Sequence, residues 1–548
     1  MGTREKMAVL ILLTLIVGDL IYFTDRAYTA VTKPAATYGG EYREGILGQP
    51  RLLNPIVAAT SADQGLVRLI YSGLYKYDES GNLIPDLAEE LPTISDDQKR
   101  YTVRLREGAL WHDGRSLTAG DIVFTVQLLQ DPDYNSPLRG TWRNTQVEKN
   151  GDYTVIFSNK DITAPFIHNL TLPIMPEHIW KHISNANFLL ASENLEAVGS
   201  GPYSLSEIKK LPSGDIEHIK LESFSNYYSG KPYISSITAV FYDTYEDMVE
   251  GLQAKAIDGF GYVSVDTQLT VDTNKYNLQL SHFTLPQYQA VFFNIKHPVL
   301  GDSSVRMALQ VATDIPAILE AVYYNAGKAL GGPILPEQLH ETNNKQPPAA
   351  DLASSASMLE VSGWKVNTTT GIRTKGKTPL AFTLTTNDLP SNAKAASMLV
   401  DQWKKLNIMV QLNIVSTKDL ADDYLRPRTF DALLFAAKLS PDPDPFLFWH
   451  SSQVKDPGLN VTQFSNPEVD KLISEARNTT NQESRIPKYK QIQDIISKEH
   501  PAIFLNQTTF IYAISKQVQG MRLTDMFDPA YRFFDAPHWY IEEKRVLK

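Results

Sequence analysis

The sequence predicts a mixed α/β protein, and two observations support this fold class. Stretches typical of strands alternate with stretches typical of helices, and no internal repeat or low-complexity tract orders them. The 548 residues suffice for roughly two to four domains, and 43% of them are hydrophobic, which supplies a core. The net charge of -10 comes without a basic cluster and argues against nucleic acid as a partner, because phosphates are met by lysine and arginine gathered on one face.

The N-terminus predicts a membrane anchor. Residues 7–23 are mostly apolar and follow two basic residues, and their length of about 17 lies at the lower limit for a membrane span. Cleavage after Ala30 would leave Tyr28 where a signal peptide needs a small side chain. We therefore expect an uncleaved N-terminal helix that holds the protein on the outer side of the cytoplasmic membrane. Residues 27–40, rich in Ala, Thr, Pro and Gly, predict a short irregular tether.

A strand, a turn and a helix start follow one another in the first quarter of the chain. Apolar and polar side chains alternate over residues 101–107, as in a half-buried strand. His-Asp-Gly at 112–114 predicts a turn. Thr118 with Asp121 three residues later predicts a capping box for a helix over residues 122–129.

Further signals predict more elements of both kinds. The Asn-Gly pair at 150–151 lies between two strand-like runs and predicts a hairpin, because this pair tolerates positive φ. Pro176 predicts the start of a helix after an extended run. Asp302 or Ser303 can cap a helix with apolar residues at helical spacing. Asn466, followed by a proline, predicts another helix start.

The order of these motifs resembles the extracellular solute-binding proteins of peptide-type ABC importers, family 5. Within residues 71–124 the chain has GLY, an Asp with Gly, Pro with LAE, the alternating strand, WHDG, and LTA followed by an acidic residue. Later parts of the family pattern occur in the same order: GSGPY at 199–203, FN before a helix with VR and AL at 293–309, SGW at 362–364 and NPEVDKLI at 466–473. The resemblance covers about residues 38–545.

The resemblance implies a two-lobed, periplasmic-binding-protein-like fold of type II, the large peptide-binding class, with an extra subdomain in the first lobe and a hydrophobic N-terminal helix. The expected division is anchor and tether at 1–37, lobe I at 38–61, 178–282 and 505–548, the extra subdomain at 62–177, and lobe II at 283–504. Two extended segments would join the lobes. Residues 278–294 and 501–514 are the candidates, since both are rich in β-branched and aromatic residues. Such a pair of strands can act as a hinge.

The function implied by the resemblance is the substrate-binding component of an ABC importer. It would capture a small solute, in the first instance a short peptide, between the lobes and pass it to two permease subunits with their cytoplasmic ATPases. No enzymatic activity and no cofactor are implied. An extracytoplasmic hydrolase acting on peptides or glycans is the alternative from another class, and a ligand-sensing or chaperone module of the same fold is a third. The sequence leaves the identity of the ligand open.

Residues 371–378, GIRTKGKT, match the phosphate-loop pattern GxxxxGK[ST], but their surroundings do not. A phosphate loop leads into a helix whose amides face the phosphate, whereas Pro379 and an alternating strand follow here. We therefore expect a hairpin loop at this place.

Metal and catalytic sites lack a complete set of residues. His178 and His182 have the spacing of a metal pair, but position 179 is Ile, and no third ligand lies nearby in the sequence. His112 and Asp113 fit the geometry of a turn better than acid–base chemistry. The chain has no GxSxG elbow and no cysteine, so it offers neither nucleophile, and a lipid-modified cysteine and disulfides are excluded as well.

The segment 430–452 is the best candidate for a ligand site, because an apolar strand runs directly into a loop of prolines and aspartates. Ligands in open α/β sheets collect beyond the carboxyl ends of strands. Asp442 and Asp444 can meet a cationic group on a ligand, or they can shape the turn. Many peptide-binding family members hold the peptide amine with an Asp seven residues before an FL pair. That position is Leu439 here, preceded by Lys438, so an amine-held ligand is in doubt.

Ten residues are predicted to contact the ligand: Asn54, Tyr262, Tyr288, Phe292, Lys438, Ser440, Asp442, Asp444, Trp449 and Phe504. The aromatic members can supply apolar walls, since small-molecule sites are mostly apolar with a few oriented polar groups. They fit core positions as well.

Overall fold

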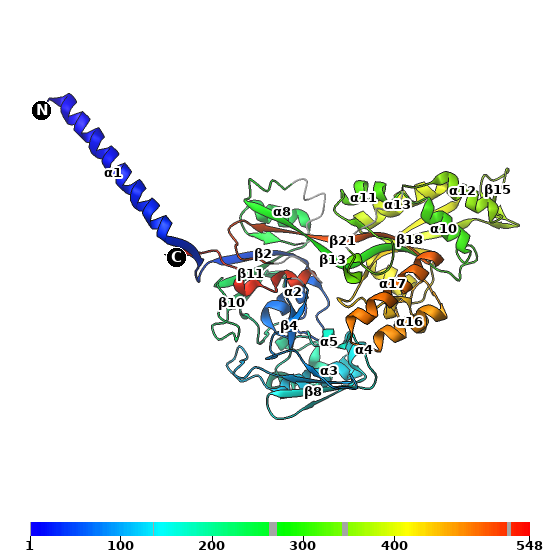
Figure 1. Ribbon diagram of the computed structural model, residues 1–548, viewed down its shortest axis with the longest axis horizontal. Helices are drawn as coiled ribbons and strands as arrows, with labels where there is room; N and C mark the ends of the chain where they lie inside the picture. Colours follow the sequence, from blue (N-terminus) through cyan, green and yellow to red (C-terminus); the bar gives the residue numbers. More distant parts are fainter. Residues whose placement is uncertain (1, 80, 135, 262–270, 342–348, 523–527) are drawn as a thin grey trace.

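Two long strands run through the centre of the molecule and belong to both of its lobes (Figure 1). They are β13 (Leu278–Phe293) and β21 (Ala502–Ser515), which pair antiparallel. The structure is a computed structural model that describes residues 2–79, 81–134, 136–261, 271–341, 349–522 and 528–548. The order of the central sheet is β19-β18-β20-β13-β21-β12-β2-β11-β10-β9, with β14 (Lys328–Ala329) beside β21. The strands before β13 in this order belong to lobe II and those after β21 to lobe I.

The pair of strands β13 and β21, here called the hinge pair, is irregular at its middle. The register steps from Thr284 paired with Thr509 to Tyr288 paired with Gln507, so β13 carries extra residues there. Pro286 lies in this bulge, where a residue without an N–H is tolerated. Strands were predicted over both segments and are present.

Lobe I is built on one end of the hinge pair. Its strands are β12 (Gly259–Phe260), β2 (Glu41–Leu47), β11 (Ser236–Tyr242), β10 (Ile216–Ser223) and β9 (Tyr203–Lys210). Helix α2 (Ser61–Ile70) begins with a capping box between Thr60 and Asp63 and buries its apolar side against this sheet. Helix α8 (Tyr245–Gln253) packs with β12 in a second apolar cluster.

The extra subdomain has its own sheet and core. The sheet has the order β5 (Thr93–Ile94), β6 (Arg100–Arg104), β8 (Thr154–Asn159) and β7 (Thr145–Lys149), and a two-stranded sheet of β3 (Tyr75–Tyr77) and β4 (Leu83–Pro85) lies nearby. Helix α3 (Ala119–Gln130) packs on it and starts at the predicted capping box of Thr118 and Asp121. The predicted hairpin at 150–151 joins β7 to β8, with Gly151 at φ 76°. Short helices complete the subdomain and its border: α4 (Arg139–Trp142), α5 (Phe166–Asn169), α6 (Glu177–Trp180) and α7 (Asn185–Phe188).

Lobe II is a sheet with helices on both faces. The strands β18 (Ala381–Asn387), β19 (Met409–Val415) and β20 (Ala432–Lys438) run parallel, and β20 pairs antiparallel with β13. One face packs on α10 (Ser303–Val311), α11 (Ile315–Tyr323), α12 (Leu352–Val361) and α13 (Pro390–Lys404), and the other on α15 (Phe446–Trp449), α16 (Pro467–Arg477) and α17 (Gln482–Glu499). The predicted caps are present, since Asp302 accepts from Ser304 N and Asn466 from Glu468 N.

The phosphate-loop-like segment forms a small ribbon at the end of lobe II (Figure 1). Its strands are β15 (Lys365–Val366), β16 (Arg373–Lys375) and β17 (Thr378–Pro379), with Gly376 at φ 63° in the turn. No helix follows the turn, so the hairpin prediction is confirmed.

The N-terminal helix α1 (Thr3–Val31) extends away from the two lobes (Figure 1). Judged on length and hydropathy, none of the helices in the described parts of the chain could cross a bilayer. The prediction of an irregular tether is wrong in part, because β1 (Thr32–Ala36) follows α1 directly and pairs antiparallel with β22 (Glu543–Leu547). The backbone of this segment is ordered by the far end of the chain, which its own composition does not reveal.

Candidate ligand-binding site between the two lobes

The loop after β20 reaches lobe I at two places. Lys438, the last residue of β20, forms an ion pair with Asp528, which caps the 3-10 turn η6 (Pro529–Phe533) of lobe I. Asp442 faces His168 of helix α5 in the subdomain, with 3.7 Å between Oδ2 and Nε2. The predicted residues Lys438 and Asp442 therefore lie where the two lobes touch.

Two further contacts join α16 and α17 to the subdomain. Thr480, between these helices, donates from its backbone N–H and its hydroxyl to the side-chain oxygen of Gln98, both at 3.0 Å. The backbone N–H of Ala164 donates to the carbonyl of Arg477 at 3.1 Å. The lobes are thus joined by the hinge strands on one side and by noncovalent contacts on the other.

Asp442 is buried and already paired. Arg485 of α17 donates from both terminal nitrogens to its two carboxylate oxygens, at 2.6 and 2.7 Å, and also contacts the Tyr489 hydroxyl. Burial alone would lower the pKa of Arg485, but the hydrogen bonds to Asp442 hold it above its ordinary value. A bidentate Arg–carboxylate pair of this kind leaves little capacity for a cationic ligand.

His168 closes this cluster from the subdomain side. Its Nδ1 lies 2.7 Å from the Tyr77 hydroxyl, and the two rings are stacked at 5.9 Å. Burial lowers the pKa of His168; Asp442 opposes this effect and Arg485 adds to it. The imidazole is therefore held in its neutral form beside the ion pair.

Asp444 lies in the same loop as Asp442, but its surroundings favour the ionised carboxylate less. Its Oδ2 is 3.1 Å from Arg477 Nε, in an ion pair without hydrogen-bond geometry, and Oδ1 accepts from Phe446 N. Burial raises the pKa of Asp444 to about 6, although Arg477 acts in the opposite direction. Ser440 is exposed, and its hydroxyl accepts from the backbone N–H of Asp442 at 3.3 Å.

The aromatic candidates come together, but in the core of lobe II. Tyr288, Phe292, Trp449 and Phe504 are at most 6% exposed. The ring of Phe504 lies 5.2 Å from that of Tyr288 and 6.0 Å from that of Trp449. Strand periodicity predicts which face these residues occupy but not that helices cover both faces of this sheet.

One candidate lies apart from this group. Asn54 is fully buried in lobe I. Its side-chain nitrogen donates to the Asn194 side-chain oxygen at 3.1 Å, and its side-chain oxygen accepts from the backbone N–H of Ile56. These bonds hold a local turn. Tyr262 lies outside the described residues.

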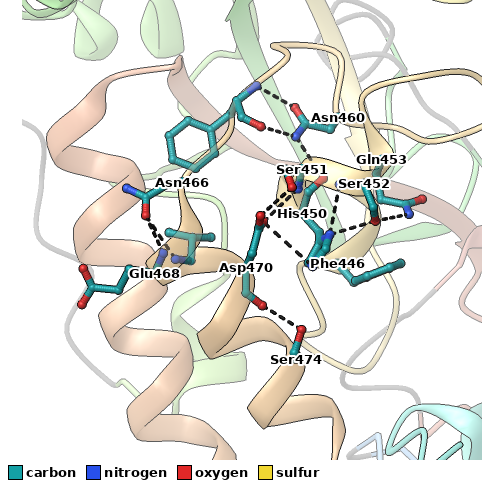
Figure 2. A network of polar contacts seen from close by, with 12 residues as sticks. Phe446, His450, Ser451, Ser452, Gln453, Asn460, Asn466, Glu468, Asp470 and Ser474 are labelled. Atoms are coloured by element: carbon teal, nitrogen blue, oxygen red, sulfur yellow. Dashed lines mark hydrogen bonds and ion pairs between the residues drawn. The ribbon is translucent and has the colours of Figure 1, made fainter.

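A polar network fixes the end of the loop to α16 (Figure 2). Ser451 donates to Asp470 from its backbone at 2.9 Å, and Nδ1 of His450 accepts from the backbone N–H of Ser452 at 3.1 Å. The Ser452 hydroxyl also contacts Nδ1, while Nε2 lies 3.9 Å from Asp470, beyond hydrogen-bond distance. These residues look like a Ser–His–Asp set but act as the cap of the turn η5 (Ser451–Gln453).

His178, one of the two histidines with the spacing of a metal pair, has another contact. His178 Nε2 lies 2.7 Å from Asp113 Oδ2 and ties the His-Asp-Gly turn to α6. Burial lowers the pKa of His112 to about 4. Among the described residues, no group of three or more His, Cys, Asp or Glu side chains could hold a metal ion.

Several residues at the lobe contact escaped sequence reasoning: Arg68, Tyr77, His168, Arg485, Asp528 and Tyr531. One of them carried a signal. Arg485 occupies a core position of α17 together with Tyr489, Ile492 and Ile496, and a buried arginine requires an acidic partner. The others come from distant segments and have no local pattern.

Known proteins resemble this chain over nearly its whole length. Residues 82–457 match the family model described as bacterial extracellular solute-binding proteins, family 5 middle. The oligopeptide-binding protein AppA of Bacillus subtilis (strain 168) is 29% identical, with 92% of each chain covered. The structure of AppA from Bacillus subtilis in complex with a nonapeptide aligns with a TM-score of 0.76 at 28% identity, over 93% of this chain and all of that one.

Two more relatives show the breadth of the group. The heme-binding protein A of Haemophilus influenzae (strain ATCC 51907 / DSM 11121 / KW20 / Rd) is 25% identical, over 82% of this chain and 84% of that protein. The ABC transporter substrate-binding protein CtaP of Listeria monocytogenes has a TM-score of 0.80 at 24% identity, over 92% of this chain and 100% of that one, which supports the fold alone. With the fold, the lobe contact and the family match in agreement, this chain belongs to the bacterial extracellular solute-binding proteins of family 5.

Proposed function

We propose that this protein captures a peptide between its two lobes and delivers it, chemically unaltered, to an ABC importer. Family membership supports the role of an extracytoplasmic receptor. The ligand class is supported by AppA, which was solved with a nonapeptide and which this chain matches over 92% of both sequences. The permease subunits and their ATPases are the partners that follow from this role.

The contact between the lobes carries the proposal. Lys438 and Asp442 lie at and just after the end of β20 in lobe II, and they contact Asp528 and His168 of lobe I, respectively. The strands β13 and β21 form the covalent connection between the lobes. Contacts of this kind can break and reform as the hinge moves. A ligand that touches both lobes favours the closed form by the difference between its affinities for the two forms.

The proposed division of the chain follows the same picture. Lobe I takes residues 38–61, 178–282 and 505–548, the subdomain takes 62–177, and lobe II takes 283–504. Limited proteolysis of the full chain, followed by mass spectrometry of the fragments, tests it. Cuts should fall in loops within the lobes and the subdomain and spare β13 and β21, which hold both limits of lobe II, and a first cut inside either strand would contradict it.

Native mass spectrometry of the purified full chain tests the ligand class. We expect a ladder of carried peptides of mixed sequence, whose masses stay the same after prolonged incubation with the protein. A single non-peptide molecule of fixed mass would overturn the peptide class. Peptides that shorten during incubation would overturn the role of a receptor and favour a hydrolase.

We further propose that α1 holds the protein at the cytoplasmic membrane. The apolar side chains of its described part are exposed, with Leu10, Leu15, Leu20 and Phe23 between 62 and 66%. Exposed apolar surface of this extent marks a membrane or protein contact. In fractionated cells the full chain should sediment with membranes and a variant lacking residues 2–31 should not. Equal distribution of the two proteins would rule out this role of α1.

A further inference from the structure

The guanidinium of Arg68 lacks a carboxylate partner among the residues that the structure describes. Arg68 lies near the end of α2 and is half-buried. Its charge lies over the ring of Tyr531, with 4.3 Å from the guanidinium carbon to the ring centre. Its one hydrogen bond to the described residues is a long one of 3.5 Å from Nη1 to the carbonyl of Thr171.

Arg68 lies between the two places where the β20 loop meets lobe I. Tyr531 belongs to η6, the turn that Asp528 caps, and Asp528 pairs with Lys438 of lobe II. On the other side the Tyr531 ring lies 5.7 Å from that of Tyr77, which bonds to His168 and so leads to Asp442. A ligand held between the lobes would therefore pass close to Arg68.

Among the described residues, the charges around Arg68 do not balance. Arg68 and Lys438 bring two positive charges, and Asp528 brings one negative charge. Burial would raise the pKa of Asp528, but Lys438 and, more weakly, Arg68 hold it below its ordinary value, so this carboxylate is ionised.

The other carboxylates near Arg68 that the structure describes are already paired. Asp86 is taken by Lys76 at 3.0 Å, and Asp442 by Arg485. A half-buried cation without a counter-ion costs free energy, which an anionic ligand group would recover.

We propose that Arg68 binds a carboxylate of the captured ligand, with Lys438 as the second cation; the inference rests on the proposed capture of peptides. The planar guanidinium matches a carboxylate in bidentate geometry, whereas a lysine meets it as a point charge. The guanidinium also makes a cation–π contact with the ring of Tyr531, which helps to hold it in place. The carboxylate is either the C-terminus of the peptide or an Asp or Glu side chain.

Equilibrium dialysis of the full chain against three pools of random tetrapeptides tests the proposal. The first pool has free C-termini and no acidic side chains, the second is the same pool with amidated C-termini, and the third is amidated but carries one Glu. Mass spectrometry measures the enrichment of each pool. The wild type should enrich the first or the third pool by about tenfold over the second, the effect of a charge-assisted hydrogen bond pair. The pool that is enriched identifies the source of the carboxylate.

Substitutions of Arg68 separate recognition from folding. The readout is the ratio between the pools, which a general loss of stability does not change. In Arg68→Gln the ratio should fall several-fold, with only Lys438 left to favour a carboxylate, and in Arg68→Lys it should fall less because the charge remains. Arg104→Gln, at an exposed arginine of the subdomain paired with Glu89, should keep the wild-type ratio.

The possible failures can be told apart. If the wild type binds all three pools equally, or if Arg68→Gln keeps the wild-type ratio, the role of Arg68 is overturned and peptide capture stands. If the wild type binds no pool, peptide capture is overturned, and the inference falls with it.

Discussion

The two contacts between the β20 loop and lobe I differ in burial and in charge balance. In the contact between Asp442 and His168, the Asp442 side chain is 4% exposed and is already paired with Arg485 of its own lobe, which is 5% exposed. In the contact between Lys438 and Asp528 the lysine side chain is 59% exposed and the carboxylate 19%, and the charge of Arg68 lies nearby. From this difference we infer that the buried contact holds the loop in place, while the more exposed one can exchange its partner for a ligand.

Replacement of Arg485 should give the largest effect on stability. In Arg485→Met the carboxylate of Asp442 stays buried without its partner, which should lower the free energy of unfolding by about 3–5 kcal/mol. Urea denaturation of the full chain, followed by tryptophan fluorescence, measures the loss. Asp442→Leu combined with Arg485→Met should regain most of it, because no buried charge is left behind.

A lysine on the same helix provides the matched control. Lys488 of α17 pairs with Glu475 at 3.2 Å nearer the surface, so Lys488→Met should cost at most about 1 kcal/mol. If Arg485→Met costs no more than this control, the buried pair is not a framework and the comparison of the two contacts fails.

Asp444 lies in the same loop as Asp442, and its contribution to stability should depend on pH. Its pKa of about 6 in the folded protein exceeds the ordinary value, so the folded state binds this proton more tightly than the unfolded chain. The contribution of Asp444 to stability is therefore largest below about pH 4 and is lost as the pH rises towards and through 6. As the pH rises from 4 to 7, the free energy of unfolding of Asp444→Asn should increase by on the order of 2 kcal/mol relative to that of the wild type.

Urea denaturation of both proteins at pH 4, 5, 6 and 7 checks this expectation. A difference between wild type and variant that stays constant over this range would show that Arg477 fully offsets the burial of Asp444.

Much of the fold was predictable because its signals are local. The capping box of Thr118 and Asp121 and the turn at 150–151 depend on residues within a few positions of each other. The strand β1 could not be predicted in this way, since its partner β22 lies at the opposite end of the chain. The family resemblance supplied the two-lobed arrangement, which no local pattern shows.

The site was predictable in position more than in chemistry. The end of β20 was expected to carry it, and Lys438 and Asp442 do lie at the lobe contact. Asp442 looked available for a cationic ligand because its partner Arg485 is 43 residues further on. The spare positive charge arises from Arg68, whose surroundings are assembled from three separate segments.

Replacement of Lys438 should give the smallest effect on stability and so provides the opposite limit of the comparison. Ion pairs at the surface contribute about 0–1 kcal/mol to stability. The free energy of unfolding of Lys438→Met should therefore lie within about 1 kcal/mol of the wild-type value. The same holds for the control Lys418→Met, which breaks the surface pair with Asp422. The two variants should differ in binding, because only Lys438 lies beside Arg68. In the dialysis measurement, Lys438→Met should bind carboxylate-bearing tetrapeptides more weakly than the wild type does and should bind the amidated pool equally well. A stability loss as large as that of Arg485→Met would instead make Lys438 part of the framework, and the exposed contact could then not exchange its partner for a ligand.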